Sequence, residues 1–410
     1  MRHQGSVSTS VVIALAIATA GEPLYAQAAQ PSGQAVPAQT ESAAAPNAEF
    51  ERLAKLANEA REAERVADAI SLYQQALRLQ PSWNEGLWYL GSLYYSTDQF
   101  VEARDVFRRL AATLPKHGPT WAFLGLCEFQ LRDYERAVTD LDKARTLGLG
   151  DNRLLVHVTH YNLAILLSRF GRFEQAYKIL KGFVYEANRE PSVIEAFGLC
   201  TLRMPYLPEE VPPDKREMVL LAGEATYNMA STAFQDADQQ FRELLARYPG
   251  TPNLHYAYGV FLITWHYPEK GREEFRRELE VSPGHVPARL QIAHGFMLQG
   301  DYSTALPFAE EAVKLSPNVG NTHYALGRAL LGMGQVRRAI PELEVAVKLE
   351  PENGDAHFLL AGAYRRVGRK QDAARQTAEF VRLDRIQRRL QEATPAVASQ
   401  PQPAESPPKQ

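Results

Sequence analysis

Residues 84–117 read NEGLWYLGSLYYSTDQFVEARDVFRRLAATLPKH and contain two amphipathic patterns separated by a polar turn. Apolar and small side chains recur at helical spacing on one stripe of each pattern: Leu87, Leu90, Gly91 and Tyr94 in the first, and Ala103, Phe107 and Leu110 in the second. The small residues allow the two helices to approach closely, while the leucine, tyrosine and phenylalanine side chains fill the space around them. The stretch therefore predicts two helices packed face to face.

The same signals recur with a period of 34 residues. Prolines that end a helix share this period within two groups, Pro81 and Pro115, then Pro249, Pro283, Pro317 and Pro351. Small residues follow the same interval: Ala69, Ala103 and Ala137, then Ala237, Gly271, Ala305, Ala339 and Ala373. The combination of L-x-x-L-G-x-x-Y, A-x-x-x-F and a following proline resembles the tetratricopeptide repeat, over roughly residues 50–387 and in about nine units.

This resemblance implies an all-α fold, namely an α-solenoid in which about nine helix pairs and one half-repeat stack as a right-handed superhelix. In such a stack the first helices of the pairs line the concave surface. We expect an N-terminal block of repeats over residues 49–203, ending in the half-repeat, and a C-terminal block over residues 218–390.

The period fails in residues 204–217, MPYLPEEVPPDKRE. A unit begins on time at Pro191, but the four prolines of this segment forbid a continuous helix. The next recognisable unit starts at Met218, 27 residues after Pro191. We therefore expect a half-repeat whose second helix is replaced by an extended connecting segment, which divides the two blocks. This segment either braces the fold or contacts a partner.

A second departure is the turn WHYPEK of residues 265–270, in which His266 stands where a neighbouring unit has Gly300. Trp265, His266 and Tyr267 either form a contact patch or fold back on their own repeat.

The two ends of the chain differ in composition from the repeats. Residues 1–26 carry Arg2 and an apolar run from Val11 to Ala20, a pattern typical of a cleaved secretory signal peptide. Residues 27–48 and 391–410 are rich in Ala, Gln, Pro and Ser, and we expect a disordered linker and a disordered tail. The protein is thus expected to be exported, either periplasmic or secreted, without a stable membrane span after signal cleavage, because the apolar run has about half the necessary length.

The charge balance argues against nucleic acid as a partner. The chain has 45 basic and 48 acidic residues, without the basic surplus that a phosphate backbone attracts. Its two cysteines, Cys127 and Cys200, lie within helical apolar patterns typical of buried free thiols. A disulfide between them in an oxidising compartment remains an alternative.

The sequence contains none of the common catalytic motifs, such as a phosphate-binding loop, H-E-x-x-H or G-x-S-x-G. We predict that the protein is not an enzyme and needs no cofactor or metal. His157 and His160 lie one helical turn apart, and His323 and His357 occupy equivalent positions in adjacent repeats. We interpret these histidines as packing residues, because no acidic or cysteine ligand accompanies them at nearby turns.

A second stripe runs beside the core stripe of the first helices and, by resemblance to the family, faces the concave side. It is aromatic and aliphatic, with arginines toward its C-terminal end, which suits a peptide or protein partner with apolar anchors and an acidic group. Its candidate partner-binding residues are Trp88, Tyr95, Phe129, Tyr161, Tyr256, His294, Tyr324, Arg328, Phe358 and Arg365. The competing interpretation is that several of these aromatics complete the packing between neighbouring first helices.

The favoured function is a non-catalytic scaffold of the bacterial cell envelope that binds peptide or protein partners in this concave aromatic groove. The alternative is a carbohydrate-binding module for cell wall or exopolysaccharide that supports export, in which the aromatic rings stack on a glycan. The acidic and amide residues that sugars usually require are sparse on the stripe.

Overall fold

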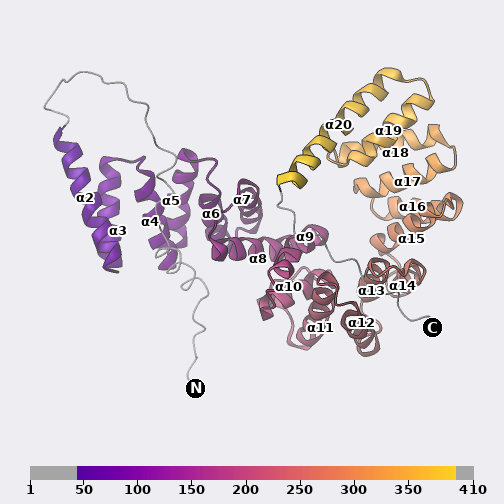
Figure 1. The fold of residues 1–410 in the computed structure, drawn as a ribbon, viewed down its shortest axis with the longest axis horizontal. Coiled ribbons are helices and arrows are strands. Elements are labelled where there is room, and N and C mark those ends of the chain that lie inside the picture. Colours follow the sequence, from indigo (N-terminus) through magenta and orange to yellow (C-terminus); the bar gives the residue numbers. More distant parts are fainter. Residues whose placement is uncertain (1–43, 394–410) are drawn as a thin grey trace. The chain divides into compact units, whose positions relative to one another are not determined.

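The computed structural model describes residues 44–393, and all regular structure in this range is helical (Figure 1). The range holds 19 α-helices, the number that nine pairs and one single helix require, and this confirms the expected α-solenoid. The expected signal peptide, most of the expected linker and residues 394–410 of the expected tail lie outside the described residues. Contacts divide the chain into two compact units between Gln240 and Phe241.

In the first unit, consecutive helices contact one another from α2 to α11. Its helices are α2 (Ala44–Glu62), α3 (Val66–Leu79), α4 (Asn84–Ser96), α5 (Phe100–Thr113), α6 (Gly118–Gln130), α7 (Tyr134–Leu147), α8 (Arg153–Arg169), α9 (Phe173–Tyr185), α10 (Pro191–Thr201), the short 3₁₀ helix η1 (Pro208–Glu210) and α11 (Pro213–Ala230). One continuous hydrophobic core runs from Ala57 to Tyr227. The helix α12 (Phe234–Arg247) contains the division between the units.

The second unit continues the same arrangement. Its helices are α13 (Leu254–Thr264), α14 (Pro268–Val281), α15 (Val286–Leu298), α16 (Tyr302–Leu315), α17 (Gly320–Gly332), α18 (Val336–Leu349), α19 (Gly354–Arg366) and α20 (Lys370–Ala393). Each helix of this unit contacts the next one along the chain.

The small residues in the middle of the first helices allow a large side chain of the second helix to pack directly against the backbone. A Cβ atom on Gly91 would lie 2.8 Å from Cζ of Phe107, and one on Gly327 would lie 2.6 Å from Cγ of Leu343. Both Phe107 and Leu343 are fully buried, each 16 residues after its glycine. This recurring contact explains why a small residue repeats in step with the period.

The terminal helices extend further than the sequence suggested. α2 begins at Ala44, within the expected linker of residues 27–48, and α20 ends at Ala393, within the expected tail of residues 391–410. Alanine has the highest helix propensity, and Pro46 is tolerated because it lies in the first turn of α2.

The single helix α10 packs against the helix α11. A Cβ atom on Gly198 would lie 1.9 Å from the carbonyl oxygen of Val219, and one on Gly223 would lie 1.9 Å from that of Ile194. This crossed pairing makes α10 and α11 antiparallel, with their backbones in contact. We expected an extended segment in the place of the second helix of this unit. The helix α11 occupies that place instead.

The connecting segment is correspondingly shorter than residues 204–217. The helix α11 begins at Pro213, since a proline at the first helical position loses no intrahelical hydrogen bond. The close packing of α10 on α11 joins the structure across the segment, and the compact units divide later, between Gln240 and Phe241. The grouping of repeats into blocks over residues 49–203 and 218–390 stays a prediction.

The remaining part of the segment packs against α10. Leu207 and Val211 are 1% and 3% exposed, and η1 contacts α10. The Glu210 carboxylate accepts a 2.9 Å hydrogen bond from the backbone N–H of Leu207 and pairs with Arg169 of α8. The backbone hydrogen bond and then the Arg169 guanidinium lower the pKa of Glu210. These contacts support the interpretation of the segment as a brace.

The turn of residues 265–270 adopts the geometry of its glycine-containing equivalents. His266 has a φ of 65°, in the left-handed region that Gly300 occupies at 77°. The half-buried Trp265 packs its ring 5.5 Å from that of Phe261 and 5.3 Å from that of Tyr267. Trp265 therefore folds back on its own repeat.

Candidate partner-binding surfaces

The stripe residues of the first unit are largely used in packing. Tyr95 is 1% exposed, and its ring lies edge-on to those of Phe100 and Phe123 at 5.4 Å. Trp88 is half-buried, with its ring 5.9 Å from that of Phe107 and 5.3 Å from that of Phe123. For Tyr95 and Trp88, the packing interpretation describes the observed contacts.

Three other aromatic residues of the predicted stripe are half-buried. Phe129 packs its ring 5.7 Å from that of Tyr134, and burial raises the pKa of the Tyr161 hydroxyl. In the second unit, the ring of Tyr256 lies 5.6 Å from that of Phe275 and 4.9 Å from that of His285. Part of each ring is therefore already covered by a neighbour.

The C-terminal part of the stripe is more accessible. His294 of α15, Phe358 of α19 and Arg365 of α19 are exposed, and Tyr324 and Arg328 of α17 are half-buried. Phe358 is 52% exposed, and its inner side packs against Phe380 of α20 with ring centroids 5.3 Å apart.

The Arg328 charge influences the pKa of two other residues of the stripe, His294 and Tyr324. Partial burial and then the Arg328 charge lower the pKa of His294. Burial raises the pKa of Tyr324, and the Arg328 charge opposes this shift. His294 therefore remains neutral at pH 7, and the positive charge of this surface comes from arginine. Such a surface can bind a carboxylate beside an apolar anchor.

His323 and His357 of the first helices are buried and used in packing, whereas His157 is half-buried and pairs with Glu186. His323 and His357 are 8% and 6% exposed, and Nε2 of each ring lies 2.9–3.0 Å from the carbonyl oxygen of the proline six residues earlier. Nδ1 of His323 lies 2.6 Å from Oε2 of Glu342, and Nδ1 of His357 lies 2.5 Å from Oε1 of Gln376. Trp121 makes the equivalent bond, donating from Nε1 to the Pro115 carbonyl at 3.0 Å. Each ring thus joins the end of one repeat to the start of the next.

A buried carboxylate in the first unit was missed by the sequence analysis. Glu128 of α6 is 2% exposed, and its Oε2 is buried without a hydrogen-bond partner. Oε1 lies 3.6 Å from Nη2 of Arg108. Burial and the neighbouring Asp140 raise the pKa of Glu128 to about 8, and burial also raises the pKa of Asp140.

These groups line a cleft of about 480 Å³ between α5, α6 and α7, which Trp121 also borders. Nζ of Lys143 lies 3.2 Å above the centroid of the Trp121 ring. The repeat itself carried a signal for this site, because Glu128 follows Tyr94 by one full period at a buried position.

Cys127 and Cys200 are buried free thiols. Burial raises the pKa of both, to about 12 for Cys200, whose Sγ donates to the Phe173 carbonyl at 3.1 Å. Within residues 44–393, the His, Cys, Asp and Glu side chains form no group of three that could hold a metal ion. None of the helices in this described range combines the length and hydropathy that a bilayer crossing needs.

Stacked antiparallel helix pairs with a constant period and exposed polar and aromatic positions define a helical-repeat protein. One profile described as tetratricopeptide repeat matches residues 54–118 and 324–382, and a second such profile matches residues 296–346. The chain is a tetratricopeptide repeat protein.

Two curated proteins are similar over part of the chain. The general transcriptional corepressor trfA of Dictyostelium discoideum is 27% identical over 115 residues, covering 26% of this chain and 8% of the relative. The heat-shock protein cognate co-chaperone sgt12 of Aspergillus fumigatus is 30% identical over 110 residues, covering 27% of this chain and 32% of the relative. The chain therefore spans less than a third of the length of either relative.

Solved structures of MamA are also similar to this chain. MamA 41-end from Desulfovibrio magneticus RS-1 is 23% identical with a TM-score of 0.38, covering 42% of this chain and 97% of that one. Another MamA crystal structure is 15% identical with a TM-score of 0.37, covering 40% of this chain and 96% of that one. At these values the similarity carries no functional argument.

Proposed function

We propose that the protein is a non-catalytic scaffold of the bacterial cell envelope, which binds peptide or protein partners through the first helices of its second unit. One observation carries this proposal: the stripe on α15, α17 and α19 leaves Phe358 and Arg365 exposed beside half-buried Tyr324 and Arg328. An aromatic anchor with nearby arginines favours a partner that presents an apolar side chain and a carboxylate. Membership of the tetratricopeptide repeat family supports binding of protein partners.

The proposed binding surface is narrower than the groove expected from the sequence. The rings of Trp88, Tyr95 and Tyr256 already pack against other aromatic rings, so they offer little free face to a ligand. The same contacts give no support to the glycan-binding alternative, which needs accessible ring faces for stacking on sugars. The proposed location in the envelope rests on the signal-peptide pattern of residues 1–26.

Site-specific photocrosslinking in the producing cell tests this function. A photoreactive phenylalanine analogue at position 358 should capture a discrete protein partner, and Arg328→Glu with Arg365→Glu should reduce the yield. The matched control is the same analogue at position 349, because Leu349 lies on the second helix α18 and is 39% exposed. Equal capture at positions 358 and 349, or a yield that is insensitive to charge reversal, would reject the proposed surface.

A further inference from the structure

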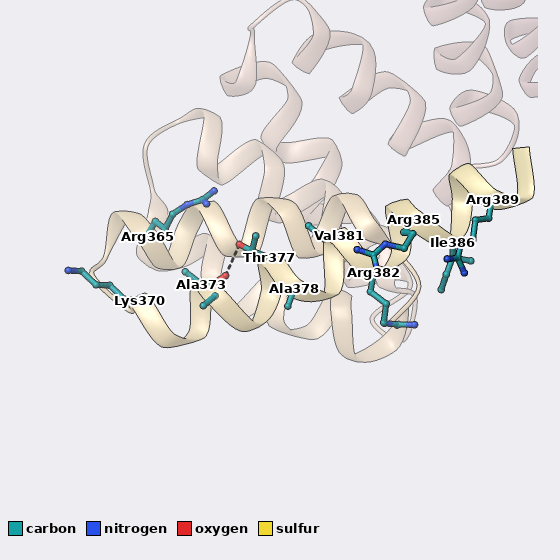
Figure 2. A pocket seen from close by; sticks show the side chains of 11 residues that line it. Arg365, Lys370, Ala373, Thr377, Ala378, Val381, Arg382, Arg385, Ile386 and Arg389 are labelled. Atoms are coloured by element: carbon teal, nitrogen blue, oxygen red, sulfur yellow. Dashed lines mark hydrogen bonds between the residues drawn. The ribbon is translucent and has the colours of Figure 1, made fainter. Parts of the chain in front are cut away.

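The helix α20, the last one among the described residues, has a groove along one side. It has a volume of about 880 Å³ and lies mainly along α20 (Figure 2). Its apolar lining includes Ala374, Ala378, Val381 and Ile386. Val381 and Ile386 are each 45% exposed and lie on the same groove, so they form a contiguous apolar patch with its alanines.

In the preceding repeat, the equivalent face of the second helix is covered by the helix that follows it. One period earlier, the equivalent face of α18 includes Glu344, whose Oε1 accepts a 2.6 Å hydrogen bond from the Tyr364 hydroxyl of α19. In the second unit α14, α16 and α18 each contact the first helix that follows. Within the described residues no helix follows α20, so none of these residues occupies the place of a next first helix.

The rim of the groove is positively charged. It carries five cationic side chains and no carboxylate, and Figure 2 shows Arg365 and Lys370 toward one end and Arg385 and Arg389 toward the other. These four make no ion pair with the residues that the structure describes, whereas Arg382 pairs with Glu379. Asp372, Glu379 and Asp384 of α20 line no part of the groove and are already paired, Asp372 with Arg369 and Arg375, and Asp384 with Arg388.

The length of α20 suits a helical ligand. With 24 residues it is longer than the 14-residue α18, and Gly354, the first residue of α19, lies beside Leu383. The end of α20 therefore projects beyond α19. The groove spans residues 373–389 of this helix, roughly 24 Å at the rise of an α-helix. Its alanine floor lets a second helix approach closely.

We propose that this groove binds an amphipathic helix of a partner protein, with aliphatic residues at helical spacing against Val381 and Ile386 and acidic residues against the arginine rim. The partner helix would take the position of the missing next first helix. This inference rests on the proposed scaffold function and specifies the chemistry of one partner.

The chain's own last residues match this chemistry poorly. Residues 394–410 contain five prolines and a single carboxylate side chain, that of Glu405. Prolines oppose a continuous helix, and one carboxylate cannot match several arginines. The helix α2 of a second copy also fits less well, because Arg52, Lys55 and Arg61 accompany its acidic residues.

Fluorescence anisotropy with two synthetic helices tests the groove in the full chain. One labelled, stapled peptide of about 18 residues carries leucines at helical spacing with flanking glutamates. The control peptide has the same leucines and carries lysines in place of the glutamates. The acidic peptide should bind, more weakly at high salt, and the basic peptide should not. Arg385→Glu with Arg389→Glu should raise Kd at least about tenfold.

The control variant, Arg337→Glu with Arg366→Glu, makes the same charge change at a separate cleft of the second unit and should leave Kd unchanged. Equal binding of the two peptides, or an unchanged Kd after reversal of Arg385 and Arg389, would overturn the proposal. So would binding only to phosphatidylglycerol vesicles, or self-association through α20 seen by sedimentation without peptide binding. Crosslinking at position 358 that persists while the peptide fails to bind would reject the groove and leave the scaffold function standing.

Discussion

Replacing Glu128 by glutamine should change how the stability of the first unit depends on pH. Burial and Asp140 raise the pKa of Glu128 to about 8, against an ordinary value of 4.5. Between these values the folded protein holds a proton that the unfolded chain has released. The free energy of unfolding therefore falls as pH rises through this interval, and the stabilisation is fully present only below about pH 4.5. Glutamine imitates the protonated acid at every pH.

The magnitude follows from the shift and its surroundings. One pKa unit corresponds to about 1.4 kcal/mol, so the full shift sets an upper limit of about 5 kcal/mol. Arg108, 3.6 Å from Oε1, opposes the shift, and solvent screening in the cleft that Glu128 lines reduces this cost further. We expect wild type to lose roughly 2 kcal/mol more than Glu128→Gln between pH 5.5 and pH 8.5, in line with the cost of a buried unpaired polar group.

Denaturant unfolding at these two pH values, followed by tryptophan fluorescence, measures the difference. Trp83, Trp88 and Trp121 all lie in the first unit, so most of the signal reports on the unit that contains Glu128. Glu51→Gln removes an exposed carboxylate of α2 as a control and should leave the pH dependence of wild type intact. If wild type and Glu128→Gln lose the same free energy between the two pH values, the assignment of a buried, proton-binding carboxylate is wrong.

Three further changes test the packing through shifts of the denaturation midpoint. Gly198→Ala should destabilise by at least about 2 kcal/mol, because its methyl group meets the backbone of α11, whereas Gly182→Ala in α9, which meets open space, should stabilise by up to about 1 kcal/mol. Leu207→Ala should cost about 2–4 kcal/mol and Glu209→Ala almost nothing, and equal midpoints would contradict the brace. His323→Phe should cost about 1–3 kcal/mol by removing the ring's polar contacts with the Glu342 carboxylate and the Pro317 carbonyl, and an unchanged midpoint would show that these contacts contribute no stability.

The helix pairs could be predicted because each depends on contacts that repeat with the sequence. Gly91 and Phe107 lie within one repeat, and the same spacing joins Gly327 to Leu343. A contact that occurs in every unit leaves a periodic pattern in the chain. The helix ends at Ala44 and Ala393 carry no such pattern, since alanine and glutamine are equally common in helices and in linkers.

The packing of α10 on α11 could not be predicted in the same way. Its contacts bring Gly198 against the Val219 carbonyl and Gly223 against the Ile194 carbonyl, whereas Gly91 and Gly327 each meet a side chain 16 residues later. The prolines between them forbid a helix up to Pro212, but they do not determine which helix fills the vacant position. Gly198 and Gly223 were the available signal, because a glycine inside a helix implies close approach of another element.

The two units use the same repeat position for different purposes. In the first unit, Tyr95 of this stripe completes the packing between repeats, so replacing it would change stability before it changed binding. In the second unit, Phe358 and Arg365 occupy the corresponding stripe but remain exposed, so their replacement should change binding at little cost in stability. Partner specificity is therefore expected to depend on α15, α17, α19 and the face of α20, while the aromatic core of the first unit provides rigidity. The position of a residue in the repeat does not by itself show whether the residue serves packing or partner binding. The size and charge of its neighbours distinguish the two roles.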